Sequence, residues 1–251
     1  MARGLPGADS SGQVTAALVQ AATNCFGETP KFWGRYFKSP TGGSFAEYRH
    51  KVEDPVLAAA SIKLLPIAQQ TAHVNGDEDQ GASDAQLNVA DILATFPKDI
   101  LVSQGGQFLM FLDVEGVSDK APSLSIDYYT GWANTLVDFS RSQTGGAVTL
   151  LPCVYARQLD NVTWNVLVKA VASGIPCHGA WVARYPKDAA CTPIDFNNGL
   201  AIPQVKLPFD VLIWQYYENC LNGDIDLNQA NPNINAEDEF LGKLILPPSA
   251  S

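Results

Sequence analysis

The chain has 251 residues, of which 46% are hydrophobic and 17% are charged. This composition is typical of a globular protein and excludes a disordered or fibrous chain. No apolar run approaches the roughly 20 residues that a membrane-spanning helix needs. The formal net charge of −10 argues against a nucleic-acid partner, because nucleic-acid affinity comes largely from Lys and Arg side chains that neutralise phosphates.

Apolar segments that alternate with helical patterns make up the first two-thirds of the chain. Nearly continuous apolar runs indicate strands that are buried on both faces, and apolar residues spaced three and four apart indicate helices. The predicted strands are residues 5–9, 32–37, 63–70, 108–116 and 148–156, and helices are predicted over 14–21, 55–62, 83–93, 129–140 and 164–171. Ser83 and Gln86 form a capping box, and Asn161 is expected to begin the last of these helices.

After residue 174 the alternation ends, and three further strands are predicted at residues 178–185, 199–205 and 209–217. Eight strands in a chain of this length fit a closed barrel better than an open sheet. We therefore expect an α/β fold, a single TIM-like barrel of the irregular (β/α)5β3 type, that forms one domain over residues 1–251. Residues 231–251 are expected to return and pack on the outside of the barrel.

Polar side chains gather where the predicted strands end, which is the end of such a barrel that carries active sites. The candidate catalytic residues are Asp9, Asp113, Glu115 and Asp226, the last expected in a loop. The candidate substrate-binding residues are Arg35, Gln69, Tyr155, Trp181, Tyr185, Trp214 and Gln215. Carboxylates among aromatic and amide side chains suit glycosidic cleavage. One protonated carboxyl donates to the leaving oxygen, and a second carboxylate stabilises the oxocarbenium-like transition state or activates water.

The acid assignment depends on Asp113 and Glu115. Residues i and i+2 of a strand share one face, so both side chains are expected to point toward the barrel axis, where close negative neighbours raise the pKa of a carboxyl. Glu115 has the longer side chain and lies nearer the strand's exit, and we take it as the general acid. The alternative for the pair is a buried structural network with Arg35 as counter-ion. The alternative for Asp9 is a helix N-cap, and for Gln215 an outward orientation.

These residues fall into ordered motifs that resemble the lysozyme-type enzymes of glycoside hydrolase family twenty-five. In chain order the motifs are Asp9, LDVEG with Asp113 and Glu115, WVARY with Trp181, Ala183 and Tyr185, WQY from Trp214, and DLN with Asp226 and Asn228. The resemblance implies five β/α units plus three strands, and hydrolysis of the β-1,4 bond between N-acetylmuramic acid and N-acetylglucosamine in peptidoglycan. It also implies Glu115 as general acid, with Asp9, Asp113 and Asp226 as supporting carboxylates.

The middle of the chain departs from that pattern. FWGRYF, KLLPIAQQ and residues 75–93 are more similar to a related, poorly characterised group of glycoside-hydrolase-like barrels. Two alternatives therefore stay open. One is a catalytically weak or inactive barrel that serves as a carbohydrate-binding module, and the other is a chitinase-like enzyme on a neutral polymer, which the acidic net charge favours. A polysaccharide partner suggests an extracellular or cell-wall-directed protein, although no signal peptide is visible.

The cysteines and the acidic loop after residue 220 give weaker signals. Five cysteines without a CxxC spacing argue against a zinc site, and Cys191 is able to pair with Cys220 or with Cys177. Residues 224–228 mimic the D-x-D-x-N start of a calcium loop, but Gly at the sixth position and Glu at the twelfth are missing. We expect no metal and no other cofactor.

Overall fold

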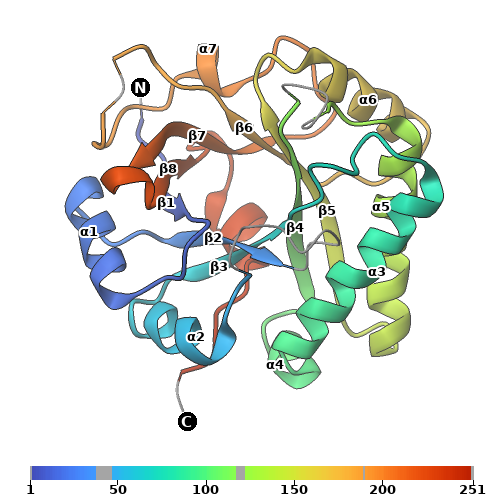
Figure 1. Cartoon of the computed structure of the whole chain (residues 1–251), viewed down its shortest axis with the longest axis horizontal. Helices are drawn as coiled ribbons and strands as arrows, with labels where there is room; N and C mark the ends of the chain where they lie inside the picture. Colours follow the sequence, from blue (N-terminus) through green and yellow to red (C-terminus); the bar gives the residue numbers. More distant parts are fainter. Residues whose placement is uncertain (1, 38–46, 117–121, 189, 250–251) are drawn as a thin grey trace.

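In the computed structural model, eight strands close into a barrel that helices surround (Figure 1). The structure describes residues 2–37, 47–116, 122–188 and 190–249. The strands are β1 (Pro6–Asp9), β2 (Phe32–Phe37), β3 (Lys63–Ala68), β4 (Gln107–Val114), β5 (Thr149–Arg157), β6 (Ala180–Ala183), β7 (Val211–Cys220) and β8 (Ile225–Ala230). The helices are α1 (Ala16–Phe26), α2 (His50–Ala59), α3 (Glu78–Thr95), α4 (Lys98–Ser103), α5 (Ile126–Thr144), α6 (Asn161–Ala172), α7 (Asn198–Ala201), η1 (Leu221–Gly223), η2 (Ala236–Phe240) and η3 (Leu241–Lys243). None of these described helices combines the length and apolar character that crossing a membrane requires.

The strands follow one another around the barrel in chain order. β1 to β7 run parallel, each paired with the next. β8 pairs antiparallel with both β7 and β1 and so closes the barrel. Each of the first five strands leads into a helix, and three strands follow. The α/β barrel expected from the sequence is therefore confirmed.

Consecutive side chains of β4 point alternately into the barrel and toward the helices outside it. Leu109 and Phe111 belong to the apolar cluster inside the barrel, whereas Phe108, Met110 and Leu112 pack in the outer cluster beneath the helices. All five side chains are 0% exposed. Because both faces of the strand are dry, its sequence is apolar without interruption.

The last strand is not the one that the sequence pattern predicts. Residues 199–205 form no strand, and most of the short helix α7 lies there instead, begun by Asn197, whose side chain accepts from the Gly199 N–H at 2.9 Å. Residues 225–230, expected as a loop, form β8. The sequence IDLNQA lacks an apolar run because Asp226 and Asn228 face the polar end of the barrel interior.

One of the two helix-start signals is wrong and the other is confirmed. Helix α3 begins well before Ser83, at Glu78, and its N-cap is Asp77, which accepts from the Gln80 N–H at 2.9 Å. The capping box at Ser83 is therefore inside a helix, where its sequence pattern has no capping function. Helix α6 begins at Asn161, as expected.

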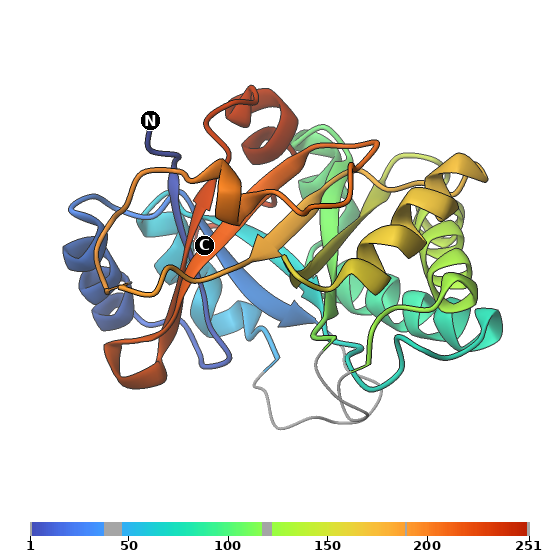
Figure 2. The same cartoon turned by 90° about the horizontal axis from the view of Figure 1, so that it is seen from above.

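The C-terminal segment closes one end of the barrel. Phe240 packs edge-on against Phe32, with ring centroids 4.9 Å apart, and Lys63 Nζ donates to the Leu241 carbonyl oxygen at 2.7 Å. Phe32 and Lys63 begin β2 and β3, so the segment covers the end opposite the carboxyl ends of the strands (Figure 2). The expectation that this segment packs on the outside is wrong for Phe240 and Leu241, which join the interior cluster. It holds for Ile245, which bridges to Leu64 and packs in the outer cluster; residues 250–251 lie outside the described part.

A disulfide ties the segment after β6 to the end of β7. It joins Cys191 and Cys220, whose Cα atoms are 5.6 Å apart, and it decides between the two pairings that the sequence left open. Cys177 is a free thiol.

Candidate active site

A cavity of about 50 Å³ lies where the parallel strands reach their carboxyl ends and the antiparallel β8 begins. Every strand, or the residue just beyond it, contributes to its lining, which consists of Asp9, Tyr36, Ile67, Asp113, Glu115, Tyr155, Trp181, Gln215 and Asp226. All four carboxylates singled out in the sequence therefore meet here. The C-terminal segment covers the other end of the barrel, so these carboxylates lie at the end that this segment leaves uncovered.

Two of the carboxylates come from the neighbouring strands β1 and β8. Asp9 is 5% exposed and accepts from Asn228 Nδ2 at 2.7 Å. Asp226 accepts from the Asn219 backbone N–H at 2.7 Å. Asp9 is not a helix N-cap, because Thr15 caps α1, so the alternative considered for Asp9 is wrong.

The other two carboxylates come from β4 and the residue beyond it. Asp113 is 5% exposed and accepts from the Thr71 hydroxyl at 3.3 Å. Glu115 is more open, with 35% of its side chain exposed, and its Oε2 lies 3.8 Å from Nη2 of Arg157. The counter-ion of this pair is thus a half-exposed arginine of β5 rather than Arg35.

Gln215 connects the two halves of the cavity. Its Nε2 donates to Asp9 Oδ2 at 3.2 Å and to Asp226 Oδ2 at 3.0 Å. Its Oε1 accepts from the Tyr155 hydroxyl at 2.8 Å and from the Tyr185 hydroxyl at 3.0 Å. The side chain therefore points into the barrel, and the outward alternative is wrong.

Trp181 forms the floor of the cavity. Its ring is 1% exposed and meets the Tyr155 ring edge-on, with centroids 4.9 Å apart. Its Nε1 donates to Asn228 Oδ1 at 2.9 Å, which orients the amide whose nitrogen binds Asp9. Trp181 thus supports the carboxylates from below and offers little ring surface to a ligand.

Burial raises the pKa of every carboxyl in the cavity, because a charged group loses hydration there. The pKa of Asp113 is raised to about 8, by burial first and then by the charge of Glu115. Burial also raises the pKa of Glu115, against the lowering effect of Arg157. The pKa of Asp226 is raised by burial to about 6, and that of Asp9 is raised by burial and by Asp226. The cavity therefore retains protons near neutral pH.

Four of the predicted binding residues do not line the acidic cavity; one of them, Tyr185, lines the neighbouring groove, and the other three are Arg35, Trp214 and Gln69. Arg35 lies on the outer face of β2, fully buried against Glu53, and Tyr36 is the residue of β2 that faces the cavity. Trp214 points outward from β7 and donates from Nε1 to the Arg184 carbonyl oxygen at 2.8 Å. Gln69, just after β3, is 9% exposed and is not part of the lining. We leave these three out of the proposed site.

On β2, the alternation of side chains along a strand could have indicated Tyr36, rather than Arg35, as the residue that faces the cavity. Asp9 pairs in register with Gly34, and an added Cβ at Gly34 would lie 2.8 Å from the Asp9 side chain. Gly34 therefore faces the axis, as does Tyr36 two residues later. Asn228 is the other residue missing from the predicted site, although it belongs to the DLN motif.

A larger groove of about 520 Å³ lies beside the acidic cavity. It is lined by Gly116, Ser123, Arg157, Gln158, Leu159, Asp160, Asn161, Val162, Ala183, Arg184 and Tyr185. Tyr185 joins the two spaces, since its hydroxyl binds Gln215, and Arg157 joins them through Glu115. The groove has the size of a ligand pocket. Among the described residues, no three His, Cys, Asp or Glu side chains are grouped to hold a metal ion.

Comparison with known proteins identifies the fold. No family model matches the sequence, and no curated protein matches it. Among solved structures, the chain is similar to an uncharacterized protein from B. stearothermophilus, with 21% identity, 96% of this chain and 100% of that chain covered, and a TM-score of 0.69. It is also similar to a muramidase from Acremonium alcalophilum (19% identity, 95% and 99% covered, TM-score 0.55). A family GH25 lysozyme from Aspergillus fumigatus is a third similar structure (14% identity, 95% and 99% covered, TM-score 0.50). At these identities the likeness shows the barrel fold, which this chain shares with muramidases and lysozymes over nearly its whole length.

Proposed function

We propose that this chain is a glycoside hydrolase that cleaves the β-1,4 bonds of an N-acetylated glycan, with peptidoglycan as the substrate. The observation that carries the proposal is the convergence of Asp9, Asp113, Glu115 and Asp226 on one cavity beside a ligand-sized groove. Fold likeness to a muramidase and a lysozyme supports the same class of reaction, and so does the order of the sequence motifs.

Glu115 is the carboxyl best suited to protonate the leaving oxygen. Burial, and after it the nearby charge of Glu115, raises the pKa of Asp113 to about 8, so the two residues together keep a proton near neutral pH. We assign that proton, during bond cleavage, to Glu115, because Glu115 is the member that reaches solvent and lies next to Gly116 of the groove. A general acid of this kind requires a pKa near the working pH.

The carboxylates of β1 and β8 have supporting roles in the proposal. Asp9 and Asp226 share the Gln215 amide, and this arrangement suits a pair that positions water or the acetamido group of a sugar. The hydroxyls of Tyr155 and Tyr185 donate to the oxygen of the same Gln215 amide. Glycosidases need such a second carboxylate for the oxocarbenium-like transition state.

The test is the release of reducing ends from peptidoglycan and from chitin, side by side. We expect the wild type to act on peptidoglycan, and Glu115→Gln to lower the rate by about 10²–10⁴-fold, the usual contribution of a general acid, with unchanged thermal unfolding. Glu28→Gln is the matched control, because Glu28 is exposed and pairs only with Lys31 at 3.6 Å among the contacts of the described residues. Full activity of Glu115→Gln would remove Glu115 from the acid role.

The small volume of the acidic cavity, beside a groove of ligand-pocket size, favours a second candidate function, a carbohydrate-binding barrel without turnover. About 50 Å³ is well below the roughly 300–1,000 Å³ of a usual ligand pocket, and Arg157 favours the ionised form of Glu115. Glycan binding in calorimetry without any release of reducing ends would support this candidate. Turnover by the wild type would exclude it.

A further inference from the structure

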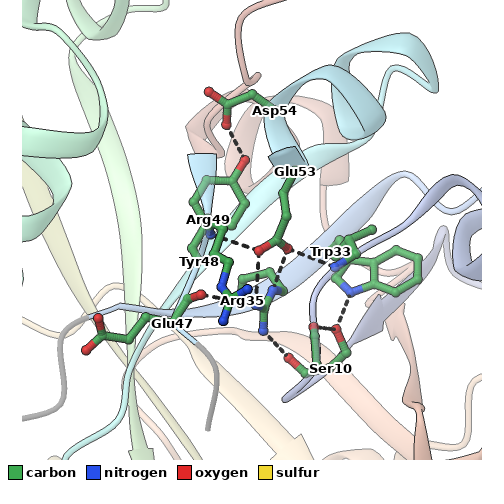
Figure 3. Close-up of polar contacts among 10 residues, drawn as sticks. Ser10, Trp33, Arg35, Glu47, Tyr48, Arg49, Glu53 and Asp54 are labelled. Carbon is green, nitrogen blue, oxygen red and sulfur yellow. Dashed lines mark hydrogen bonds and ion pairs between the residues drawn. The ribbon is translucent and has the colours of Figure 1, made fainter. Parts of the chain in front are cut away.

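A buried ion pair lies on the outer face of β2, opposite the face from which Tyr36 lines the proposed site. Figure 3 shows the pair and its polar contacts. Arg35 Nε lies 2.7 Å from Glu53 Oε2, and Arg35 Nη2 donates to Glu53 Oε1 at 3.1 Å. Arg35 comes from β2 and Glu53 from α2, and both side chains are 0% exposed. Apolar residues of similar volume often stabilise a fold as well as a buried pair does. The pair therefore needs an explanation other than stability.

Both members of the pair bind the backbone that follows Asp9. Arg35 Nη1 donates to the Ser10 carbonyl oxygen at 2.7 Å, and Glu53 Oε2 accepts from the Val14 N–H at 3.0 Å. Residues 10–15 belong to no helix or strand, so these backbone groups depend on partners outside regular secondary structure. The ion pair supplies such partners at both ends of the segment 10–14.

A further contact fixes the first residue of that segment. Trp33, from the same outer face of β2, donates from Nε1 to the Ser10 hydroxyl at 2.9 Å (Figure 3). The carboxylate of the neighbouring residue, Asp9, accepts a hydrogen bond from Asn228 Nδ2 at 2.7 Å. A shift of the Ser10 backbone would therefore displace the Asp9 carboxylate from the amide that binds it.

We propose that Arg35 and Glu53 are positioning residues that act through Ser10 and hold the Asp9 carboxylate in place in the cavity. The inference rests on the proposed function for what Asp9 does there. Arginine suits the role because its rigid fork donates in several fixed directions at once, toward Glu53 and toward Ser10, which the single ammonium of lysine does not reproduce. Since the two charges cancel, the pair orients Asp9 without adding net charge behind the carboxylates.

The experiment compares Arg35→Lys and the double variant Arg35→Met/Glu53→Met with the wild type. The double variant removes both charges, so no buried charge is left without a partner. The matched control is Tyr48→Phe, which removes a buried hydrogen bond from Tyr48 to Asp54, a residue of the same helix α2. That bond does not involve the segment 10–14. Thermal unfolding checks that each variant is folded at the assay temperature. If the double variant is not folded, Arg35→Lys alone tests the proposal.

Two readouts follow, and one of them does not depend on turnover. In both Arg35 variants we expect kcat to fall about 10–100-fold with KM nearly unchanged, because a displacement of about 1 Å can cost 10²-fold. In the same variants, the titration of Asp9, followed by carboxyl carbon NMR, is expected to shift, because burial raises the pKa of Asp9 and the hydrogen bond from Asn228 lowers it, and displacement of the carboxylate alters both. Tyr48→Phe is expected to change neither quantity.

The outcomes separate this inference from the proposed function. A lower kcat together with an altered Asp9 titration supports the positioning role. An unchanged Asp9 titration in both Arg35 variants overturns it, whatever kcat does, and so does an equal effect of Tyr48→Phe. If the wild type releases no reducing ends, the proposed function fails, while the NMR titration still decides whether Arg35 and Glu53 hold Asp9.

Discussion

Asp9 and Asp226 are directly opposed residues of the β1–β8 ladder, and one amide nitrogen, Gln215 Nε2, donates to both of them. The two carboxylates therefore share a single donor between them. Their proximity is one cause of the raised pKa of Asp9, after burial. The pair exists only because the barrel closes, since no local segment of the chain contains both residues.

Replacement of Gln215 tests whether this shared amide matters. Gln215→Leu keeps a side chain of similar size but removes the donor to both carboxylates and the acceptor of two tyrosine hydroxyls. We expect kcat to fall about 10²-fold or more, as when one preorganised donor is lost, and the free energy of unfolding to fall by about 1–3 kcal/mol per buried group left unpaired. Reducing-end assays and urea unfolding measure the two effects. Gln204→Leu is the control, since Gln204 is exposed, and wild-type kcat in Gln215→Leu would contradict the prediction.

The raised pKa of Asp113 predicts how stability depends on pH. An unfolded aspartate loses its proton near pH 4, whereas Asp113 keeps its proton in the folded state up to about pH 8. Between these values the folded state binds more protons, so the free energy of unfolding falls as the pH rises from about 4 to about 8.

Urea unfolding at several pH values in this range measures that slope. In Asp113→Asn the slope should become shallower, because the amide does not titrate. Asp99→Asn, at an exposed position of α4, should keep the wild-type slope. Equal slopes in Asp113→Asn and the wild type would show that Asp113 titrates near its ordinary pKa.

Arg157 is expected to set the alkaline limit of activity. Its charge lowers the pKa of Glu115, and a general acid works only while it is protonated. Arg157→Gln should therefore raise the pKa of Glu115 and move the alkaline limb of the kcat/KM profile to higher pH. Arg184→Gln is the control, because Arg184 lines the same groove but forms no ion pair with an acidic side chain among the described residues. An equal shift in both variants would point to the overall charge of the groove.

Two helices outside the barrel cross at glycines. An added Cβ at Gly131 of α5 would lie 2.0 Å from the Glu78 carbonyl oxygen, and one at Gly81 of α3 would lie 2.1 Å from the Tyr128 carbonyl oxygen. In an ordinary exposed helix, Gly→Ala is stabilising by about 0.5–1 kcal/mol. Gly131→Ala should instead destabilise by about 1–3 kcal/mol, because the backbones must move apart. A higher melting temperature in calorimetry would show that the crossing is looser than described.

The sequence predicted the barrel because its strands are buried on both faces and read as unbroken apolar runs, as β4 does. It also placed the four carboxylates at one end, because strand ends of a barrel meet there. It failed where polar residues face the interior: Asp226 and Asn228 made β8 look like a loop. The prediction was also wrong on β2, where Arg35 was chosen as a binding residue because of its charge, although its neighbour Tyr36 is the residue that faces the cavity.

The remaining errors depend on contacts between distant segments. The C-terminal segment closes one end of the barrel because Phe240 packs against Phe32. The local sequence pattern of residues 231–251 does not indicate which surface of the barrel this segment contacts. Trp214 resembles a sugar-binding residue by type, yet it packs on Phe196 outside the barrel, with ring centroids 5.6 Å apart. Residue type alone did not separate the two faces of β7.

The hydrogen bond from Asn228 to Asp9 spans 219 positions of the chain, and it has a consequence for how the protein matures. During synthesis β1 is made first, and Asp9 must wait for the last strand before its carboxylate gains this amide. Contacts so distant in sequence form late and slowly. A nascent chain or a fragment that ends before β8 would carry Asp9, Asp113 and Glu115 but would lack Asp226 and Asn228, so the acidic cavity is complete only once the last strand of the barrel is in place.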